Sequence, residues 1–398
     1  MRKTRTTLVA VAAVVTLALG ACAQDSGADP TTPAGADTPG TAETTDAVEP
    51  TEPTEAPDTG DTTEPTETET EAAEPTGDRP APFADGGVRI AIVQNTGQGD
   101  YFQQYLNGTR LQAELLDVEL DVYDAQGDNA TQASQLDQAI ASGVDGIVVR
   151  HGFAEALCPG VNQAIDQGIP VVIYDVEIQT CAPRAVQTQQ SDEFMASLVL
   201  DQMVEEMGQD VKVGYVNVLG IAPLDRRDVV WNEYKAENNW EELFFTGRYT
   251  ASTATDTAPM VDSALKANPD VQAIYAPYDE LTKATITALQ QNPGMEDVMV
   301  YGADISTADI ELMVAEGSPW RGTGATDPNA IGAAVTRTLF LLMADELDTI
   351  NVEFPPVLVT QDFLRENNIN NMDDLRANMS ELEIGEVSSA DWMESVKF

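Results

Sequence analysis

The run Val88-Arg89-Ile90-Ala91-Ile92-Val93 is almost continuously apolar, which is typical of a strand buried on both faces of a sheet. An amphipathic stretch over 101–116 follows it, and another strand-like run covers 118–123. The alternation continues through a helix at 131–142, a strand at 144–149, a helix at 154–167 and a strand at 169–174. Strands that alternate with helices predict a parallel sheet covered by helices on both faces.

A long helical stretch over 192–207 separates this pattern from a second one of the same kind. Strands are predicted there at 211–218, 243–249, 271–276 and 298–302, and helices near 226–238, 257–267, 281–290 and 307–316. A strand at 320–326, a long helix at 328–346 that need not belong to the second lobe, and a strand at 357–360 complete the pattern.

The predicted fold class is therefore α/β, with two Rossmann-like doubly wound lobes joined by a hinge. We expect 86–192 plus 327–354 to form the N-terminal lobe, and 193–326 plus 355–398 to form the C-terminal lobe. Open α/β sheets bind ligands at the carboxyl ends of their strands. The sequence therefore predicts a ligand site in a cleft between the lobes.

The N-terminal segment 1–22 has the features of an export signal. Three basic residues precede an apolar run of about a dozen residues, which is too short to span a membrane. Its end, Leu19-Gly20-Ala21-Cys22, resembles the lipobox of bacterial lipoproteins. That resemblance implies that Cys22 is acylated and anchors the protein on the extracytoplasmic face of the cell membrane. The alternative is an ordinary secretory signal cut after Ala21.

Residues 23–85 consist mainly of Thr, Pro, Glu, Asp, Gly and Ala, with almost no large apolar side chain. Such a segment buries too little apolar surface to offset the entropy of ordering, so we predict a disordered linker. Its acidic repeats repel one another and favour an extended spacer. An O-glycosylated stalk would show the same Thr and Pro bias.

The formal net charge is −47. About −16 of it lies in the linker and the signal adds about +3, which leaves about −34 on the folded part. An acidic surface disfavours nucleic acid and anionic lipid surfaces, because binding there requires clustered Lys and Arg. We therefore expect no nucleic-acid partner and regard the acidity as a solubility trait.

Three cysteines are present. If Cys22 carries lipid, Cys158 and Cys181 form an even pair in an oxidising compartment, and we predict a disulfide between them. Two free thiols are the alternative. No metal site is predicted, because the chain has one histidine and no Cys-x-x-Cys motif. No cofactor is predicted either.

Polar and aromatic residues gather where the predicted strands end. In the first lobe these are Asn95, Gln98, Gly99, Asp100, Tyr101, Phe102, Arg150, His151 and Asp175; in the second they are Asp225, Arg226, Arg227, Tyr278, Asp279, Glu280, Asp304, Thr326 and Asp327. Aromatic faces pack against the C–H faces of a sugar ring, while carboxylates and guanidinium groups bind vicinal hydroxyls. This mixture indicates a polyhydroxylated ligand.

Several motifs in combination resemble the ribose-type members of the type I periplasmic binding proteins. They are Val88 to Val93 followed by Tyr101-Phe102, Tyr123-Asp124-Ala125-Gln126, residues 169–175, residues 269–276, Tyr278-Asp279-Glu280 and Gly302-Ala303-Asp304. The resemblance extends from residue 88 to about 360. It implies two lobes joined by three hinge strands that close on a sugar, and delivery of that sugar to an ABC importer permease.

The resemblance also implies roles for individual residues. Tyr101 and Phe102 match the aromatic pair that packs on the sugar, with core packing as the alternative. Asp175 and Asp304 match the hydroxyl-binding aspartates, although Asp304 would also serve as a helix cap. Arg227 matches the second-lobe arginine, with Arg226 as the alternative register and a solvated helix face as the alternative role.

Other positions depart from the family pattern. Val176 stands where an arginine commonly follows the aspartate, Tyr278 replaces a common Asn, Thr326 replaces an Asn or Gln, and Arg150 replaces a small polar residue. We include Arg150, Tyr278 and Thr326 among the predicted ligand-binding residues. A smaller polyol, a modified furanose or an acidic sugar would each suit such a pocket. Asp279 and Glu280 are as well explained by helix capping as by ligand contact.

The predicted function is that of a lipid-anchored solute receptor of an ABC importer, a monomer with no catalytic residues. One alternative is a receptor that presents its ligand to a membrane sensor or binds a signalling molecule. Another is a glycosidase that uses Asp175 and Asp304 as an acid/base pair, which is disfavoured because the two residues come from opposing lobes. DNA-binding regulators are excluded by the export signal, the acidity and the lack of a helix-turn-helix segment.

Overall fold

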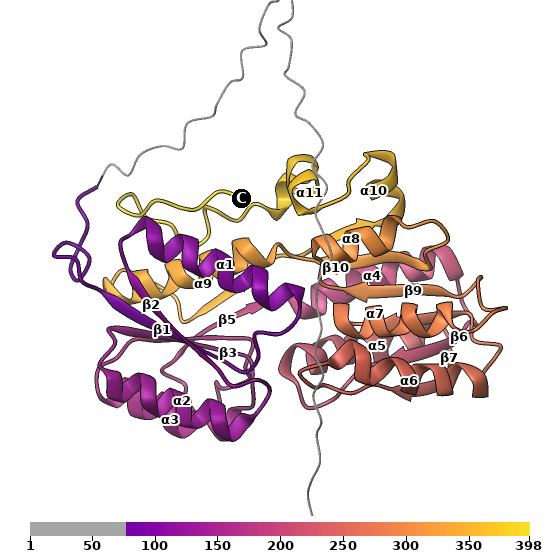
Figure 1. Ribbon diagram of the computed structural model, residues 1–398, viewed down its shortest axis with the longest axis horizontal. Coiled ribbons are helices and arrows are strands. Elements are labelled where there is room, and N and C mark those ends of the chain that lie inside the picture. Colours follow the sequence, from indigo (N-terminus) through magenta and orange to yellow (C-terminus); the bar gives the residue numbers. More distant parts are fainter. Residues whose placement is uncertain (1–76) are drawn as a thin grey trace, which may run out of the picture. The chain divides into compact units, whose positions relative to one another are not determined.

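The computed structural model describes residues 77–398, which form two lobes, each built on a six-stranded sheet with helices on both faces (Figure 1). The predicted α/β fold with two doubly wound lobes is confirmed. Cys22 and the linker up to residue 76 lie outside the described residues.

The sheet of the N-terminal lobe has six parallel strands in the order β11-β5-β4-β3-β1-β2. Their bounds are β1 Arg89–Gln94, β2 Glu119–Asp124, β3 Gly146–Arg150, β4 Val171–Tyr174, β5 Val186–Gln190 and β11 Asn351–Phe354. Helices α1 (Asp100–Leu115) and α9 (Pro328–Met343) cover one face, and α2 (Asn129–Ser142) and α3 (Ala154–Asp166) cover the other.

Strand β1 is apolar on both sides because it serves two cores. Ile90 and Ile92 pack into the cluster beneath α1 and α9, whereas Ala91 and Val93 pack into the cluster beneath α2 and α3. This is the alternation expected of successive side chains along a strand. Helices α1 and α9 approach closely at Gly108, where an added Cβ would lie 1.9 Å from the backbone oxygen of Asn329.

The sheet of the C-terminal lobe has the order β12-β10-β9-β8-β6-β7, and all its strands are parallel except β12. The strands are β6 Lys212–Val216, β7 Glu241–Thr246, β8 Ala273–Ala276, β9 Met299–Ala303, β10 Trp320–Ala325 and β12 Val357–Thr360. Helices α4 (Asp192–Met207) and α5 (Ala222–Glu237) cover one face, and α6 (Thr253–Ala267) and α7 (Asp279–Gln290) cover the other. Helices α8 (Thr307–Val314), α10 (Gln361–Glu366) and α11 (Met372–Asn378) pack at the β12 end, and a short 3-10 helix follows at Ser380–Leu382.

The chain passes between the lobes at residues 190–192, 325–328 and 354–357. It crosses a fourth time after Leu382, because Leu382 lies in a core of the C-terminal lobe whereas Ile384, Trp392 and Met393 lie in the core of the N-terminal lobe. The assignment of the whole of 355–398 to the C-terminal lobe was therefore wrong for residues 384–398. Apolar contact with the α1–α9 layer determines where this tail lies.

The predicted linker also extended too far along the chain. Residues 77–85 belong to the folded region, where Phe83 is only 3% exposed and stacks on Trp392 with ring centroids 5.2 Å apart. The amide of Gly77 donates to the carbonyl of Asp391. A single buried aromatic residue thus fixes the end of the linker against the C-terminal tail.

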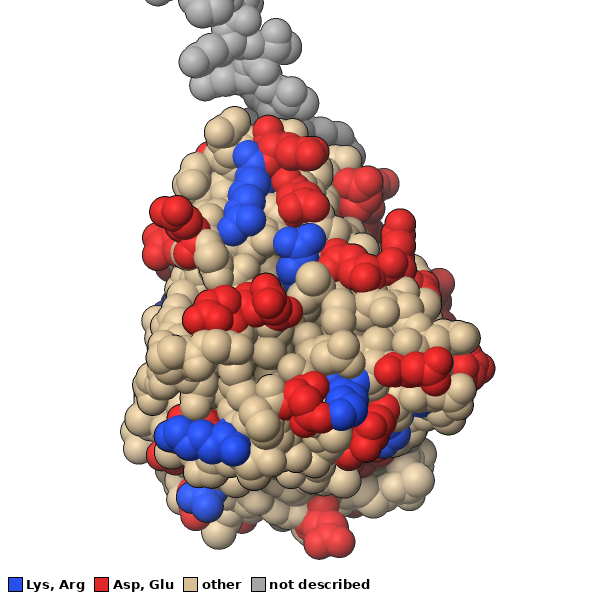
Figure 2. All heavy atoms as spheres, turned by 90° about the vertical axis from the view of Figure 1, so that its right-hand side faces the viewer, with Lys and Arg blue, Asp and Glu red and all other residues tan. Residues whose placement is uncertain are grey.

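The structure pairs Cys158 of α3 with Cys181 of the β4–β5 loop in a disulfide, consistent with the prediction. None of the helices between residues 77 and 398 combines the length and apolarity needed to cross a membrane. Within the same residues, no group of three or more His, Cys, Asp or Glu side chains is arranged to hold a metal ion. Carboxylates outnumber Lys and Arg on the side of the molecule shown in Figure 2.

Candidate ligand-binding cleft

Three residues that directly follow strands adopt the left-handed backbone conformation, which is uncommon outside glycine. They are His151 after β3 (φ 53°), Asp175 after β4 (φ 52°) and Asp304 after β9 (φ 71°). Each amide still donates to the neighbouring strand, as in the 2.8 Å bond from Asp304 to the carbonyl of Gly324. Strained turns of this kind are tolerated where the surroundings fix them, and they cluster at functional sites.

Two arginines of α5 join these strand ends in a buried network of charges. Nη2 of Arg226 lies 2.8 Å from Oδ1 of Asp175, and its Nε donates to Asp192 at 2.8 Å. Arg227 donates through Nε to the other oxygen of Asp192 at 2.8 Å, and its Nη1 and Nη2 lie 3.3 and 3.4 Å from the Asp304 oxygens. Asp175, Asp192 and Asp304 thus share two guanidinium groups, and Oε2 of Glu177 lies 3.7 Å from Nη1 of Arg226, so carboxylates outnumber arginines in this network.

Burial perturbs the titration of two of these aspartates, Asp175 and Asp304. Burial, reinforced by the charge of Asp192, raises the pKa of Asp175 to about 7. Burial also raises the pKa of Asp304 to about 6, although Arg227 opposes the shift. Because Oδ2 of Asp175 is enclosed and has no hydrogen-bond partner among the described residues, the carboxyl group retains binding capacity for a ligand.

Aromatic side chains form the other part of the cleft. Tyr101 and Phe102, in the first turn of α1, are each 4% exposed and contact one another edge to face at 5.7 Å. The Tyr101 hydroxyl is hydrogen-bonded to that of Tyr174. From the opposite lobe, Tyr278 precedes α7, and the hydroxyl of Tyr249 lies 3.4 Å from Oδ1 of Asn95.

A cavity of about 40 Å³ lies between these groups. Its lining consists of Tyr101, Phe102, His151, Gln190, Ile221, Pro223, Leu224, Arg227, Tyr249, Tyr278 and Asp304. The lobes contact each other around it, through Asp175 with Arg226 and through Asp100 with Lys283 at 2.9 Å. Since the cavity has room for only a few water molecules, a sugar can enter only when the lobes separate.

Part of the cavity lining is aliphatic. Ile221, Pro223 and Leu224 come from the β6–α5 connection and the first turn of α5, and they line the same cavity as the charged Arg227 and Asp304. The lining therefore combines hydrogen-bonding groups with aliphatic surface. A ligand that matches it carries both hydroxyl groups and an apolar substituent.

The structure brings most of the predicted residues together. Tyr101, Phe102, Arg227, Tyr278 and Asp304 line the cavity. Asp175 lies next to it, bonded to Arg226 and 3.9 Å from Nε2 of His151. Both arginines of the pair belong to the network, because Arg226 contacts Asp175, Arg227 contacts Asp304, and both contact Asp192.

Besides Asp175, two predicted residues lie outside the cavity lining. Arg150 is fully buried beneath the β1–α1 loop and donates to Oε1 of Gln94 and to the carbonyls of Thr96 and Phe102. Its guanidinium carbon also lies 4.5 Å from the centre of the Tyr105 ring. Thr326 stands at the second crossing between the lobes and donates to Oε1 of Gln190 at 2.7 Å.

Sequence reasoning left several lining residues out of the predicted site. His151 follows a predicted strand directly, and this position beside Arg150 is the sequence signal for it. Gln190 ends β5, a strand that the sequence pattern does not predict, and Tyr249 follows β7, which ends three residues earlier than predicted. The apolar group at 221–224 gave no signal, because only the folded chain turns it toward the cleft.

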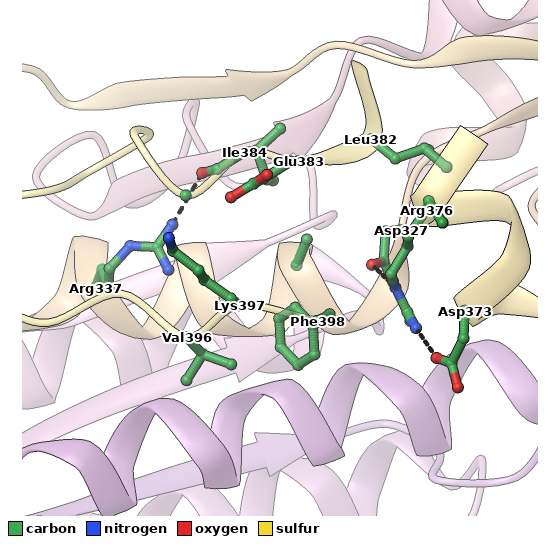
Figure 3. Close-up of a pocket in the computed structure, with 13 residues that line it drawn as sticks. Asp327, Arg337, Asp373, Arg376, Leu382, Glu383, Ile384, Val396, Lys397 and Phe398 are labelled. Atoms are coloured by element: carbon green, nitrogen blue, oxygen red, sulfur yellow. Dashed lines mark hydrogen bonds and ion pairs between the residues drawn. The ribbon is translucent and has the colours of Figure 1, made fainter. Parts of the chain in front are cut away.

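A larger cavity, of about 250 Å³, lies at the hinge between α9, α11 and the C-terminal residues (Figure 3). Both of its arginines have partners. Arg376 binds Asp327 at 2.6 Å and Asp373 at 2.7 Å, and Arg337 donates to the carbonyl of Ile384 (Figure 3). The cleft remains the candidate site, because five of the predicted ligand-binding residues line its cavity and none lines this one.

Comparison with known proteins identifies the family. The profile of the periplasmic binding protein domain matches residues 90–346. The chain belongs to this family. This periplasmic binding protein is 27% identical over 256 residues to the ribose import binding protein RbsB of Escherichia coli strain K12. The matched region covers 63% of this chain and 82% of the relative.

Solved structures agree with this assignment. The solute-binding protein of a 5-methylthioribose transporter from Thermotoga lettingae, in complex with 5-methylthioribose, is 34% identical to this periplasmic binding protein. It superposes with a TM-score of 0.74 over 77% of this chain and 95% of the other. A sugar ABC transporter protein from Yersinia enterocolitica is 27% identical, with a TM-score of 0.74 over 78% and 94% of the two chains. The family is one of extracytoplasmic solute-binding proteins of sugar ABC transporters, and its members bind ligands for transport rather than act as enzymes.

Proposed function

We propose that this periplasmic binding protein captures a furanose sugar with an apolar substituent, of which 5-methylthioribose is the leading candidate. The observation that carries the proposal is the mixed lining of the cavity, which combines the charged Arg227 and Asp304 with the aliphatic Ile221, Pro223 and Leu224. The 34% identity to the 5-methylthioribose-binding protein supports the same ligand class. Plain ribose would leave these aliphatic side chains without an apolar partner.

In this proposal the side chains divide the ligand between them. Asp175, Asp304 and the two arginines of α5 bind the ring hydroxyls through charge-assisted hydrogen bonds. Tyr101, Phe102 and Tyr278 pack on the faces of the ring. The aliphatic residues at 221–224 contact the substituent. Arg150 and Thr326 act indirectly, by fixing the β1–α1 loop and the side chain of Gln190.

Closure of the lobes is the functional motion. The ligand contacts both lobes only when the cleft is shut, so binding shifts an equilibrium between open and closed forms. The receptor, a monomer in its closed and liganded form, would deliver the sugar to an ABC permease. Acylation of Cys22, inferred from the sequence, would keep the receptor beside that permease on a linker.

A calorimetric titration of residues 77–398 tests the ligand class. We expect 5-methylthioribose to bind at least about tenfold more tightly than ribose, because contact with the aliphatic side chains contributes roughly 0.8 kcal/mol for each buried methylene-sized group. Leu224→Asn, which replaces one of these aliphatic side chains by a polar one, should reduce this preference while ribose binding changes little. Equal affinity for the two sugars, or binding of neither, would refute the proposed ligand class.

A further inference from the structure

We propose that His151 is a specificity-determining residue that, together with Asp175, binds one particular ligand hydroxyl. This inference rests on the proposed function and refines it. His151 lines the cleft cavity and is 9% exposed. It is also the only histidine of the chain.

Neither ring nitrogen of His151 has a hydrogen-bond partner among residues 77–398. Nδ1 is enclosed without a partner, and the nearest carboxylate oxygen to Nε2 is Oδ2 of Asp175 at 3.9 Å, too far for a hydrogen bond. Oδ2 of Asp175 is itself enclosed and unpaired. Buried polar groups are normally satisfied, so an unpaired imidazole beside an unpaired carboxylate oxygen points to a missing ligand group.

The position of the imidazole is fixed from several sides. The amide of His151 donates to the carbonyl of Tyr174 at 2.9 Å, and its carbonyl accepts from Nε2 of Gln132 at 2.9 Å. The ring meets Phe102 and Tyr174 edge to face, with centroid distances of 5.1 and 5.3 Å. The left-handed backbone of His151 is therefore held by its neighbours, which is a prerequisite for a selective contact.

The surroundings keep the imidazole neutral. Burial lowers the pKa of His151 well below its usual value, and the charges of Arg150, Arg227 and Arg226 lower it further. A neutral imidazole has one donor and one acceptor nitrogen. A sugar hydroxyl placed between the two side chains would donate to Oδ2 of Asp175 and accept from the N–H of His151. A ligand without that hydroxyl would leave both groups buried and unpaired, which is the most effective basis for discrimination.

Because the chain has one histidine, the ring nitrogens of His151 are a unique NMR signal in the ¹⁵N-labelled protein. Calorimetry with ribose, 5-methylthioribose, 2-deoxyribose and 3-deoxyribose first establishes which probes bind. We expect a bound sugar to move the imidazole ¹⁵N resonances, and one deoxy analogue to bind at least about tenfold more weakly than ribose.

The variant His151→Phe keeps a planar ring but removes both nitrogens. It should weaken binding of ribose while leaving that one deoxy analogue almost unaffected, so the preference between them disappears. His151→Asn, which restores polar atoms, should recover part of the preference. Gln138→Ala, an exposed change on α2, should behave as the wild type.

The outcomes separate the two proposals. If a sugar binds the wild type without moving the histidine signal, or if His151→Phe weakens all sugars equally, His151 is a packing residue and this inference fails alone. If none of the probes binds, the proposed ligand class fails and the role of His151 fails with it.

Discussion

At the scale of single residues, Asp304 is the second-lobe counterpart of Asp175. Its carboxylate lies against Arg227 inside the cavity and is 4% exposed. We predict that Asp304→Ala weakens sugar binding by about 2 kcal/mol or more, roughly 30-fold, because ligand hydroxyls and Arg227 lose a buried partner. Calorimetry measures the loss.

An exposed carboxylate provides the control for this change. Asp137→Ala, on the outer side of α2, should leave the affinity unchanged. Wild-type affinity in Asp304→Ala would mean that the residue only caps its turn, and the site assignment would have to be abandoned.

The raised pKa of Asp175 predicts an unusual pH dependence of stability. In the folded protein its pKa is about 7, because burial disfavours the charge and Asp192 repels it, whereas the unfolded value is about 3.9. The folded state therefore retains a proton that the unfolded chain releases. This stabilisation is complete below pH about 4 and is lost as the pH rises through about 7.

The variant Asp175→Asn lacks this titration. Between pH 5 and pH 7 the free energy of unfolding of the wild type should fall relative to that of the variant by up to about 2 kcal/mol. Urea unfolding of both proteins at the two pH values measures the difference. His151 is present in both proteins, so its opposing contribution to the pH dependence cancels in this comparison. Parallel pH profiles would contradict the buried, raised-pKa description of Asp175.

At the scale of elements, the first turns of α1 and α7 meet across the cleft. Lys283 of α7 lies 2.9 Å from Asp100 of α1 and also contacts Asp279, Glu280 and Asp309 of its own lobe. Burial lowers the pKa of Lys283, but the charges of Asp279, Asp309 and Glu280 outweigh this effect and raise it. The contact with Asp100 is the part of this cluster that forms only when the lobes close.

Asp100→Asn should therefore weaken binding of every sugar by a similar, small factor. The side chain of Asp100 is 42% exposed, so we expect a two- to fivefold loss, about 0.5–1 kcal/mol. The loss should arise from faster dissociation and should diminish at high salt. Stopped-flow kinetics at two salt concentrations measure it, with Glu114→Gln at the far end of α1 as the control. A change in sugar preference would show instead that Asp100 touches the ligand.

The sequence predicts the bounds of helices and strands closely where their apolar residues recur at regular spacing, and it does not predict the short polar strands. Strand β5 (Val186–Gln190) is mostly Gln and Thr, and β11 is a four-residue strand at the edge of the sheet. Both form because a neighbouring strand supplies hydrogen-bond partners, which no local pattern records. Helices α5 and α6 begin about four residues earlier than predicted, because their first turns lack an apolar period.

At the scale of the whole molecule, the C-terminal tail ties the two ends of the folded chain together. Trp392 stacks on Phe83, and its indole N–H donates to Glu346 at 2.8 Å. Gln112 and Arg337 hold the tail backbone through the carbonyls of Glu394 and Val387. The tail thus completes the N-terminal lobe after the chain has crossed the hinge.

Trp392→Ala should lower the free energy of unfolding by about 3 kcal/mol, since it removes a buried aromatic side chain and exposes Phe83. Trp392→Phe should lower the free energy of unfolding much less, because the ring contact with Phe83 persists. Urea unfolding of the two variants provides the comparison. An unchanged stability in Trp392→Ala would show that the tail is an accessory to the lobe rather than a part of its core.

The sequence by itself determined the two α/β lobes, because strands buried on both faces must be apolar along their length. It also predicted that Asp175, Asp304, Tyr101, Phe102 and Arg227 lie together at the cleft, since the ends of parallel strands and the turns after them meet at one edge of a sheet.

Only the tertiary structure decided which of the strand-end side chains face the cleft. Arg150 and His151 are adjacent in sequence, but one donates into the β1–α1 loop and the other lines the cavity. The structure likewise brought the aliphatic residues at 221–224 into the same cavity as Arg227 and Asp304 and placed the tail on the first lobe. Side-chain direction at a turn and contacts between distant segments depend on packing in three dimensions, and a one-dimensional pattern does not contain them.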